Sequence, residues 1–120
     1  LFDNVNRLIA KDGIFAVAVP NANAPEKKIF GKNWAPWDAP RHLYHFNYEQ
    51  ITLLLRKYGW EIQSAKIMFQ DTPYNILLSL KTKSPFHLVW GGLVLFYCLI
   101  KILIGGVNSS SSFMVICKKI

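Results

Sequence analysis

The chain has 120 residues, 52% of them hydrophobic, and a formal net charge of +7. This length fits one domain or part of one, and this apolar content excludes a wholly disordered chain. The charge is uneven, because residues 72–120 contain five lysines and no acidic residue. These lysines flank apolar runs instead of forming a stripe, which favours an anionic membrane surface over nucleic acid as a partner. Lysines that only solvate the ends of elements are the alternative.

The first twenty residues predict half of a βαβ unit. Residues 1–11 carry apolar side chains at helical spacing, and Gly13 is the expected end of that helix. Ile14–Pro20, IFAVAVP, is a continuous apolar run, typical of an interior strand covered on both faces of a parallel sheet. The chain starts without Met inside the helical pattern, so we expect its N-terminus to be a cut end.

Asn21 stands directly after this predicted strand. In open α/β sheets, ligands bind outside the carboxyl ends of the strands, so Asn21 is a candidate substrate-binding residue. A turn Asn that bonds only to local backbone is the alternative.

A polar loop over residues 22–28 leads to a segment, residues 31–58, that begins as a loop and ends as a helix. The loop is rich in Trp, Pro, Asp, Arg and His, and such loops carry function when a scaffold positions them. Asn47 and Gln50 have the spacing of a capping box, and Gly59 is the expected left-handed stop. The helix is therefore predicted over residues 48–58.

The second half of the chain predicts two strands separated by an apolar insert. The first strand covers residues 61–69 with a bulge near residues 64–65, and residues 71–73 form a turn. The insert, residues 86–107, is long enough to span a bilayer. A buried or amphipathic helical hairpin that covers the sheet, an interfacial segment that enters lipid and a true span all fit it. Residues 108–112, NSSSS, predict a flexible turn before a last strand over residues 113–117.

The two cysteines, Cys98 and Cys117, lie in apolar segments and lack CxxC spacing. This pattern is typical of buried thiols in a reducing compartment, so we expect a cytoplasmic protein. It also gives nucleophilic catalysis by cysteine little support.

Taken together, this order of elements resembles the C-terminal half of a class I S-adenosylmethionine-dependent methyltransferase. The likeness is to the bacterial small-molecule group related to ubiquinone-type methylases. The residues that carry it are Asp12-Gly13, Ala18-Val19-Pro20-Asn21, Trp34, Asp38, Pro40-Arg41-His42-Leu43, His45-Phe46, Tyr58-Gly59-Trp60-Glu61 and Val115-Ile116-Cys117-Lys118-Lys119. Each motif is weak alone, whereas their order and spacing together are fairly specific.

The resemblance implies an α/β fold in which residues 1–120 are one partial domain, the substrate-side half. This part holds a parallel strand and antiparallel terminal strands of a Rossmann-like sheet, with helices packed on the faces and the apolar helical insert before the last strand. In the family, a Gly-rich turn and an acidic residue that hold the cofactor precede this part, and no GxGxxG-like stretch occurs here. The main contacts of S-adenosyl-L-methionine are therefore expected outside these residues.

Methyl transfer requires that the acceptor be oriented and, when it is a hydroxyl, that its proton be removed. Within the resemblance, His42 and His45 are the candidate bases; a histidine that only braces the loop against Asp38 is the alternative. Asp38, His42 and His45 are also compatible with metal ligation, but no third strong ligand lies nearby, so no metal is expected.

The remaining candidate substrate-binding residues lie in the same loop and are Trp34, Trp37, Asp38 and Arg41. Trp34 and Trp37 are expected to form an apolar wall over the acceptor, with ordinary core aromatics as the alternative. Arg41 is expected to hold an acidic group of the acceptor, and a pair between Arg41 and Asp38 that stiffens the loop is the alternative.

Two functions follow from these patterns. The first is a methyltransferase acting on a small-molecule acceptor, such as a lipid-linked or glycan precursor. The second is a non-enzymatic module that associates with the inner face of the membrane through residues 86–107 and the flanking lysines. Self-association through exposed sheet edges is a further expectation, and nucleic acid is not an expected partner.

Overall fold

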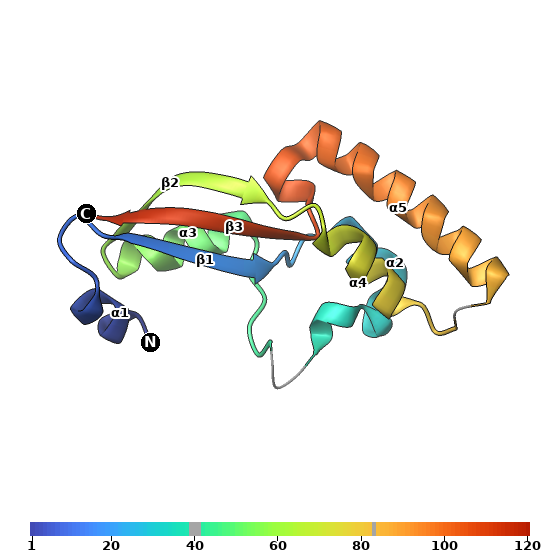
Figure 1. The fold of residues 1–120 in the computed structure, drawn as a ribbon, viewed down its shortest axis with the longest axis horizontal. Coiled ribbons are helices and arrows are strands. Elements are labelled where there is room, and N and C mark those ends of the chain that lie inside the picture. The colour runs from blue at the N-terminus through green and yellow to red at the C-terminus, as the bar shows by residue number, and fades with distance from the viewer. Residues whose placement is uncertain (39–41, 83) are drawn as a thin grey trace.

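A computed structural model describes residues 1–38, 42–82 and 84–120. The molecule is elongated, with extents of 53 × 31 × 18 Å, and has a sheet at one end and a group of helices at the other (Figure 1). The elements in chain order are α1 (Phe2–Leu8), β1 (Ile14–Pro20), α2 (Pro25–Phe30), the 3-10 helices η1 (Gly31–Asn33) and η2 (Ala35–Trp37), α3 (Tyr48–Lys57), β2 (Trp60–Ile67), α4 (Asp71–Ser79), α5 (Pro85–Gly105), the 3-10 helix η3 (Gly106–Ser109) and β3 (Ser112–Lys119).

The sheet has the strand order β1-β3-β2, and β3 is antiparallel to both neighbours. The strands β1 and β2 therefore run in the same direction, so their carboxyl ends lie at the same end of the sheet, beside Ser112 at the start of β3. The register of β2 against β3 shifts between Ile62 and Ser64, next to the predicted bulge. The mixed α/β class predicted from the sequence is thus confirmed.

The prediction that Ile14–Pro20 is an interior strand covered on both faces is wrong for this sheet. β1 lies at an edge of the sheet that the described residues form. Its side chains alternate between half-buried and exposed, and Ile14 is 63% exposed. The covered face packs on the sheet core through Phe15, Val17 and Val19, while the other face and one hydrogen-bonding edge lie open.

Two helices replace segments that the sequence predicted as a loop and a turn. Pro25 opens α2 and Pro73 lies in the first turn of α4. Proline is tolerated there because the first N–H groups of a helix have no partner within the helix. The expected end of the first helix at Gly13 is also wrong, since α1 ends at Leu8.

The insert is one continuous helix, α5, and not a helical hairpin. It has 21 residues; Pro85 stands at its start, and the Ser84 side chain accepts a bond from the backbone N–H of His87. Among the described residues it is the one helix long and apolar enough to cross a membrane, a property it shares with core helices of soluble proteins. The serine run after it is not a flexible turn, because Ser110, Ser111 and Ser112 are all buried.

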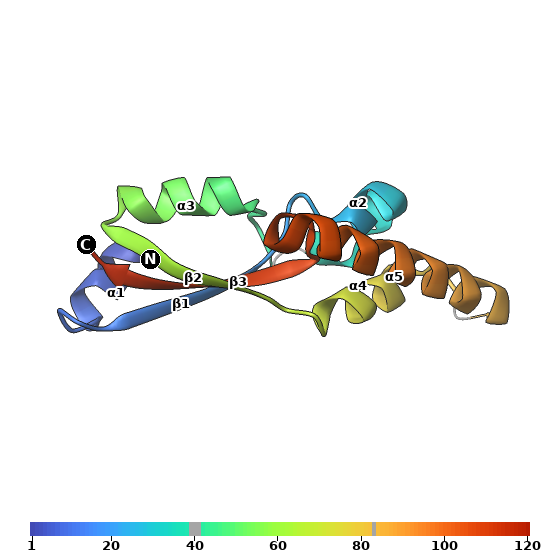
Figure 2. The same cartoon turned by 90° about the horizontal axis from the view of Figure 1, so that it is seen from above.

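The interior contains two apolar clusters. The larger one lies between α3 and the sheet and includes Ile51, Leu55, Trp60 and Phe113. The smaller one joins α4 to α5 through Ile76, Val94 and Cys98. Figure 2 shows the corresponding split, with α3 beside the sheet and with α2, α4 and α5 gathered beyond its end.

The helix α3 starts at Tyr48 as predicted and ends at Lys57, one residue before the predicted end. The Asn47 side chain accepts from the Gln50 N–H at 2.8 Å, and the Gln50 side chain accepts from the Asn47 N–H at 3.0 Å. Gly59 follows the helix with φ of 83°, a conformation that favours glycine.

Replacing Asn47 by alanine should lower the free energy of unfolding by about 1 kcal/mol, because the backbone N–H of Gln50 loses its acceptor, the Asn47 side-chain oxygen. Urea denaturation measures the change. Asn47→Asp keeps the acceptor oxygen and should stay close to the parent. Equal stability of Asn47→Ala and the parent would contradict the cap.

Candidate functional site

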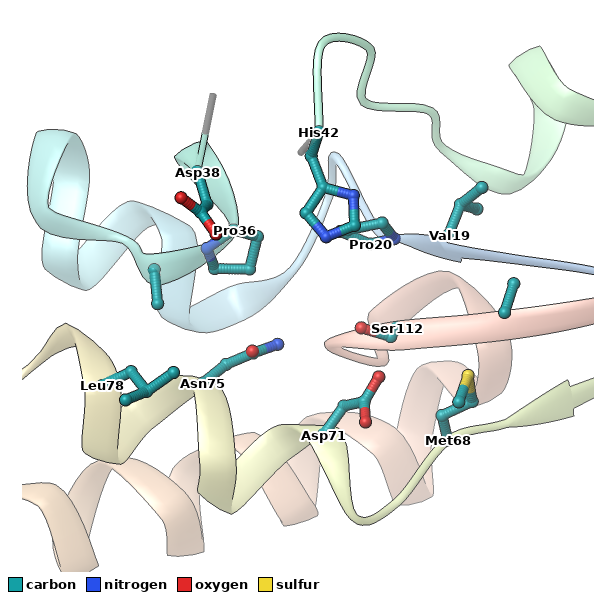
Figure 3. Close-up of a pocket in the computed structure, with 12 residues that line it drawn as sticks. Val19, Pro20, Pro36, Asp38, His42, Met68, Asp71, Asn75, Leu78 and Ser112 are labelled. Carbon is teal, nitrogen blue, oxygen red and sulfur yellow. The ribbon is translucent and has the colours of Figure 1, made fainter. Parts of the chain in front are cut away.

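A cavity of about 200 Å³ lies outside the carboxyl ends of β1 and β2 (Figure 3). Its walls come from the ends of these strands, the loop after η2, the start of α4 and the start of β3. The lining residues are Ala18, Val19, Pro20, Ala35, Pro36, Asp38, His42, Met68, Asp71, Asn75, Leu78 and Ser112. The cavity therefore occupies the place where open α/β sheets bind ligands.

His42 is the basic side chain among the described residues of this lining. Its backbone N–H donates to the carbonyl of Asp38 at 2.9 Å, which holds the backbone of His42 next to Asp38. Figure 3 shows the imidazole pointing from the loop into the cavity, on the side of Pro20. A molecule bound in this cavity would therefore meet the His42 imidazole.

Two polar cavity residues, Asp71 and Asn75, were not among the predicted site residues. They stand four positions apart on the first turns of α4, so both face the same side of the helix. The carboxylate of Asp71 and the amide of Asn75 lie opposite His42 in Figure 3. Their position directly after β2 indicates a place at the carboxyl end of that strand. They were missed because residues 71–73 were predicted to form a turn and not the start of a helix.

Asn21 does not line the cavity. Its side chain has no exposed surface, and its Nδ2 donates to the carbonyls of Ser110 at 2.8 Å, Asn108 at 3.1 Å and Val107 at 3.4 Å. Its Oδ1 accepts from the N–H of Asn23 at 2.9 Å. The expected substrate-binding role is therefore wrong in this structure, and Asn21 instead ties the end of β1 to the segment before β3.

The two loop tryptophans do not form a wall over the cavity. Trp34 is 1% exposed, and its indole N–H donates to Glu26. Trp37 is 44% exposed but donates to the Gly31 carbonyl at 3.0 Å, and its ring lies 5.0 Å below the Lys27 ammonium. The cavity takes its apolar surface from aliphatic residues, so the predicted role of Trp34 and Trp37 is corrected to packing of the loop.

His45 packs in this aromatic group and braces the loop. Its ring lies 4.7 Å from the ring of Trp37, and its Nε2 lies 2.5 Å from the Pro36 carbonyl. A carbonyl only accepts, so Nε2 carries the proton and donates. His45 thus braces the loop against the Pro36 carbonyl and not against Asp38 as the alternative had it, and it does not line the cavity, so His42 is the remaining candidate base.

Asp38 lines the cavity as predicted for a binding residue, and its carbonyl accepts the His42 bond described above. The prediction for Arg41 lies outside the described residues. Within the described part of the chain, no three His, Cys, Asp or Glu side chains lie close enough together to hold a metal ion.

A buried carboxylate organises the back of the cavity. Glu26 has no exposed surface, and its oxygens accept from the hydroxyl of Ser111, the indole of Trp34 at 3.4 Å and the thiol of Cys98 at 3.7 Å. Ser111 Oγ in turn accepts from Asn75 Nδ2 at 2.7 Å. The cavity residue Asn75 is thus held by a chain of hydrogen bonds that ends on Glu26.

The thiol of Cys98 is made a weaker acid by this setting. Burial, followed by the neighbouring Glu26 carboxylate, raises the pKa of Cys98 from 9.0 to about 12. Burial alone raises the pKa of Cys117. Both cysteines are free, as the sequence predicted, and neither is suited to nucleophilic catalysis.

Comparisons with protein-family models and with curated proteins found no match to this chain.

Replacing Ser111 by alanine should lower the free energy of unfolding by about 3 kcal/mol, because the buried Glu26 carboxylate loses its hydroxyl donor and the buried amide N–H of Asn75 loses its acceptor. The control is Ser64→Ala on the exposed side of β2, which should change stability by less than about 0.5 kcal/mol. Urea denaturation of both variants measures the difference. Equal effects of the two substitutions would contradict the role of the hydrogen-bond chain.

The folded chain should resist alkylation of Cys98 at pH 8, because the reactive thiolate is suppressed in the fold. In the unfolded chain the thiol ionises near its usual pKa of 9.0. The unfolded state therefore binds fewer protons between about pH 9 and 12, and stability should fall as the pH rises through this window. Mass spectrometry after iodoacetamide treatment, with and without urea, measures the protection. Rapid native labelling of Cys98 would contradict it.

Proposed function

We propose that this chain is the substrate-side part of an S-adenosyl-L-methionine-dependent methyltransferase that acts on a small-molecule acceptor. In this proposal its sheet is the C-terminal part of a Rossmann-like methyltransferase sheet, with β1 as the parallel strand at the seam and β3 as an antiparallel terminal strand. The activity belongs in the cytoplasm, where the free thiols of Cys98 and Cys117 persist.

One observation carries the proposal: the loop with the W…D…RHL…F pattern holds His42 against a cavity at the carboxyl ends of two strands that run in the same direction. The resemblance implies that this loop roofs the acceptor site. The antiparallel last strand between β1 and β2 agrees with the terminal strands that the resemblance implies. These features support the proposal jointly, because each occurs in other folds.

The size and lining of the cavity favour a particular kind of acceptor. About 200 Å³ is less than the roughly 300–1,000 Å³ of pockets that enclose drug-sized ligands, so only the reacting end of a larger acceptor fits. Val19, Pro20 and Leu78 offer an apolar surface, and Asp71 and Asn75 offer hydrogen-bond acceptors and donors. A hydroxyl-bearing end on a longer apolar molecule, as in a lipid-linked precursor, matches this lining.

His42 supplies the proton chemistry in the proposal. The donor, when bound, would supply a methyl carbon on a sulfonium. As the acceptor oxygen bonds to that carbon, the carbon–sulfur bond would break with its electron pair left on the departing thioether, and the hydroxyl would lose its proton. The His42 imidazole takes this proton, while Asp71 and Asn75 orient the hydroxyl. No Gly-rich turn for the donor occurs in these residues, so we assign the donor contacts to a segment outside residues 1–120.

Calorimetry with S-adenosyl-L-methionine tests the proposal. The 120-residue chain alone should show no heat of binding, whereas the polypeptide extended by the sequence encoded upstream should bind the donor. Absence of binding by the extended polypeptide would refute the methyltransferase assignment. A Gly-rich turn after a strand in that upstream sequence is the accompanying expectation.

In the extended polypeptide, His42→Ala should lower the methyl-transfer rate by about 10²–10⁴-fold, because the acceptor proton loses its base. His45→Asn is the control, because it removes an imidazole from the same loop but not from the cavity. It should lower stability and leave the rate within a few-fold of the parent. Transfer of a labelled methyl group to an acceptor extract measures both. Equal loss in the two variants would assign His42 a bracing role only.

A further inference from the structure

The long helix α5 presents an apolar surface that nothing in the described chain covers. Its buried residues form one stripe, Gly91, Val94, Cys98 and Ile102, which packs on α4 and α2. The remaining faces are apolar and exposed, among them Val89 at 66%, Leu93 at 61%, Phe96 at 66%, Leu103 at 86% and Ile104 at 81%. In Figures 1 and 2 the helix lies on the outside of the molecule, with neighbouring helices on one side only.

The arrangement around the helix axis is ordered. At about 100° per residue, the buried stripe takes up a narrow sector, and the exposed apolar residues occupy more than half of the circumference on the opposite side. The helix is about 31 Å long at 1.5 Å per residue, so this surface is a continuous convex ridge. This continuous apolar surface differs from an ordinary protein surface, on which exposed apolar residues are scattered singly.

The fold excludes a perpendicular crossing of the membrane. Both ends of α5 lead into the same folded body, since α4 follows β2 before the helix and β3 pairs with β2 after it. The middle of the helix also contacts polar interior groups, because Cys98 donates to the buried Glu26 carboxylate. A crossing would draw that carboxylate into hydrocarbon, so the helix can meet lipid only along its outer side.

One border of the ridge carries the side chains that favour the region between lipid and water. Trp90, Tyr97 and Lys101 are separated by seven and four residues, so they lie in one line along the helix. Lys28 of α2 faces this line across a groove of about 280 Å³ that Trp90 and Tyr97 also line. Trp and Tyr collect at membrane interfaces, and lysines extend from there toward anionic headgroups.

The charge beside the ridge is of one sign. Residues 72–120 contain no acidic residue, and Glu26 of the neighbouring helix α2 has no exposed surface. Among the described residues, the exposed cations on or beside α5 include Lys28, Lys81 and Lys101. A basic rim around a convex apolar ridge complements an anionic bilayer, whereas a protein partner would have to offer a deep apolar groove with an acidic edge.

We propose that α5 lies in the plane of an anionic membrane surface, with Val89, Leu93, Phe96 and Leu103 in the acyl region and the line from Trp90 to Lys101 at the headgroups. The helix then holds the domain on the bilayer as a monotopic anchor. The inference does not depend on methyl transfer, because no residue of α5 lines the cavity. The cavity and the ridge are connected through α4, which lines the cavity and also packs against α5.

Flotation with vesicles tests the anchor. The chain is synthesised in a cell-free reaction that contains vesicles of phosphatidylcholine, with or without a quarter of phosphatidylglycerol, and is then centrifuged through a density gradient. The parent should float with the vesicles, more completely when phosphatidylglycerol is present. Aggregated protein sinks, so flotation separates binding from insolubility.

Leu93→Glu should reduce the floating fraction about tenfold or more, because it places a carboxylate at the centre of the lipid-facing ridge. Leu53→Glu is the matched control, because Leu53 on α3 is also 61% exposed, and it should float like the parent. Lys101→Gln should weaken binding to phosphatidylglycerol vesicles by about fivefold and leave binding to neutral vesicles unchanged. Equal flotation of Leu93→Glu and Leu53→Glu would overturn the proposal.

Absence of flotation by the parent would also overturn it. A soluble dimer that Leu93→Glu converts to a monomer, seen by light scattering, would then assign the ridge to a second copy of the chain.

A depth measurement distinguishes lying from crossing. Val89 and Leu103 both lie on the ridge, about 21 Å apart along the axis. A fluorophore on Val89→Cys or on Leu103→Cys should be quenched to the same extent by lipids that carry a spin label at one acyl position. The native cysteines do not compete, since both are buried. Unequal quenching at the two sites would contradict a helix parallel to the surface.

Discussion

The arrangement of the helices depends on one buried carboxylate. Glu26 has no exposed surface, and among the described residues no Lys or Arg pairs with it. A carboxylate in such a place is costly unless its oxygens accept hydrogen bonds. The donors come from Ser111, Trp34 and Cys98, which belong to three separate segments, and Asn75 joins through Ser111. Satisfying Glu26 therefore fixes α2, α4, α5 and the aromatic loop relative to the sheet, and it links the two apolar clusters by polar contacts.

The cavity is a consequence of the same contacts. Ser112 and Asn75 line it, and each lies beside or on the chain of bonds that leads to Glu26. Asn21 secures the other side, because its amide spans from the end of β1 to the carbonyls before β3. Two hydrogen bonds hold the loop that carries His42, one from His45 to the Pro36 carbonyl and one from the Trp37 indole to the Gly31 carbonyl. The walls thus come from five segments whose positions are set by interior hydrogen bonds, which leaves His42 and Asp71 facing the space between them.

The features that were predictable from the sequence are those with local causes. The capping box of α3, its stop at Gly59, the bulge in β2 and the last strand are each specified by neighbouring residues. Three helices begin with proline in the first turn, at Pro25, Pro73 and Pro85, and the first two were read as loop and turn because proline signals both a break and a helix start. The serine run and Asn21 look like turn residues in isolation, and their burial depends on partners more than 80 residues away in sequence. Of the candidate site, Asp38 and His42 were found because the loop pattern marks them, whereas Asp71 and Asn75 were missed with their helix.

We propose that the open edge of β1 is the seam at which further strands of a parallel sheet join this chain. Amide hydrogen exchange across β1, measured by NMR, tests it most directly. In the 120-residue chain, the amides that face β3 should exchange slowly and those on the open edge quickly. In the polypeptide extended upstream, both sets should become slow, because the open edge acquires a partner strand. Fast exchange along that edge in the extended polypeptide would contradict the account.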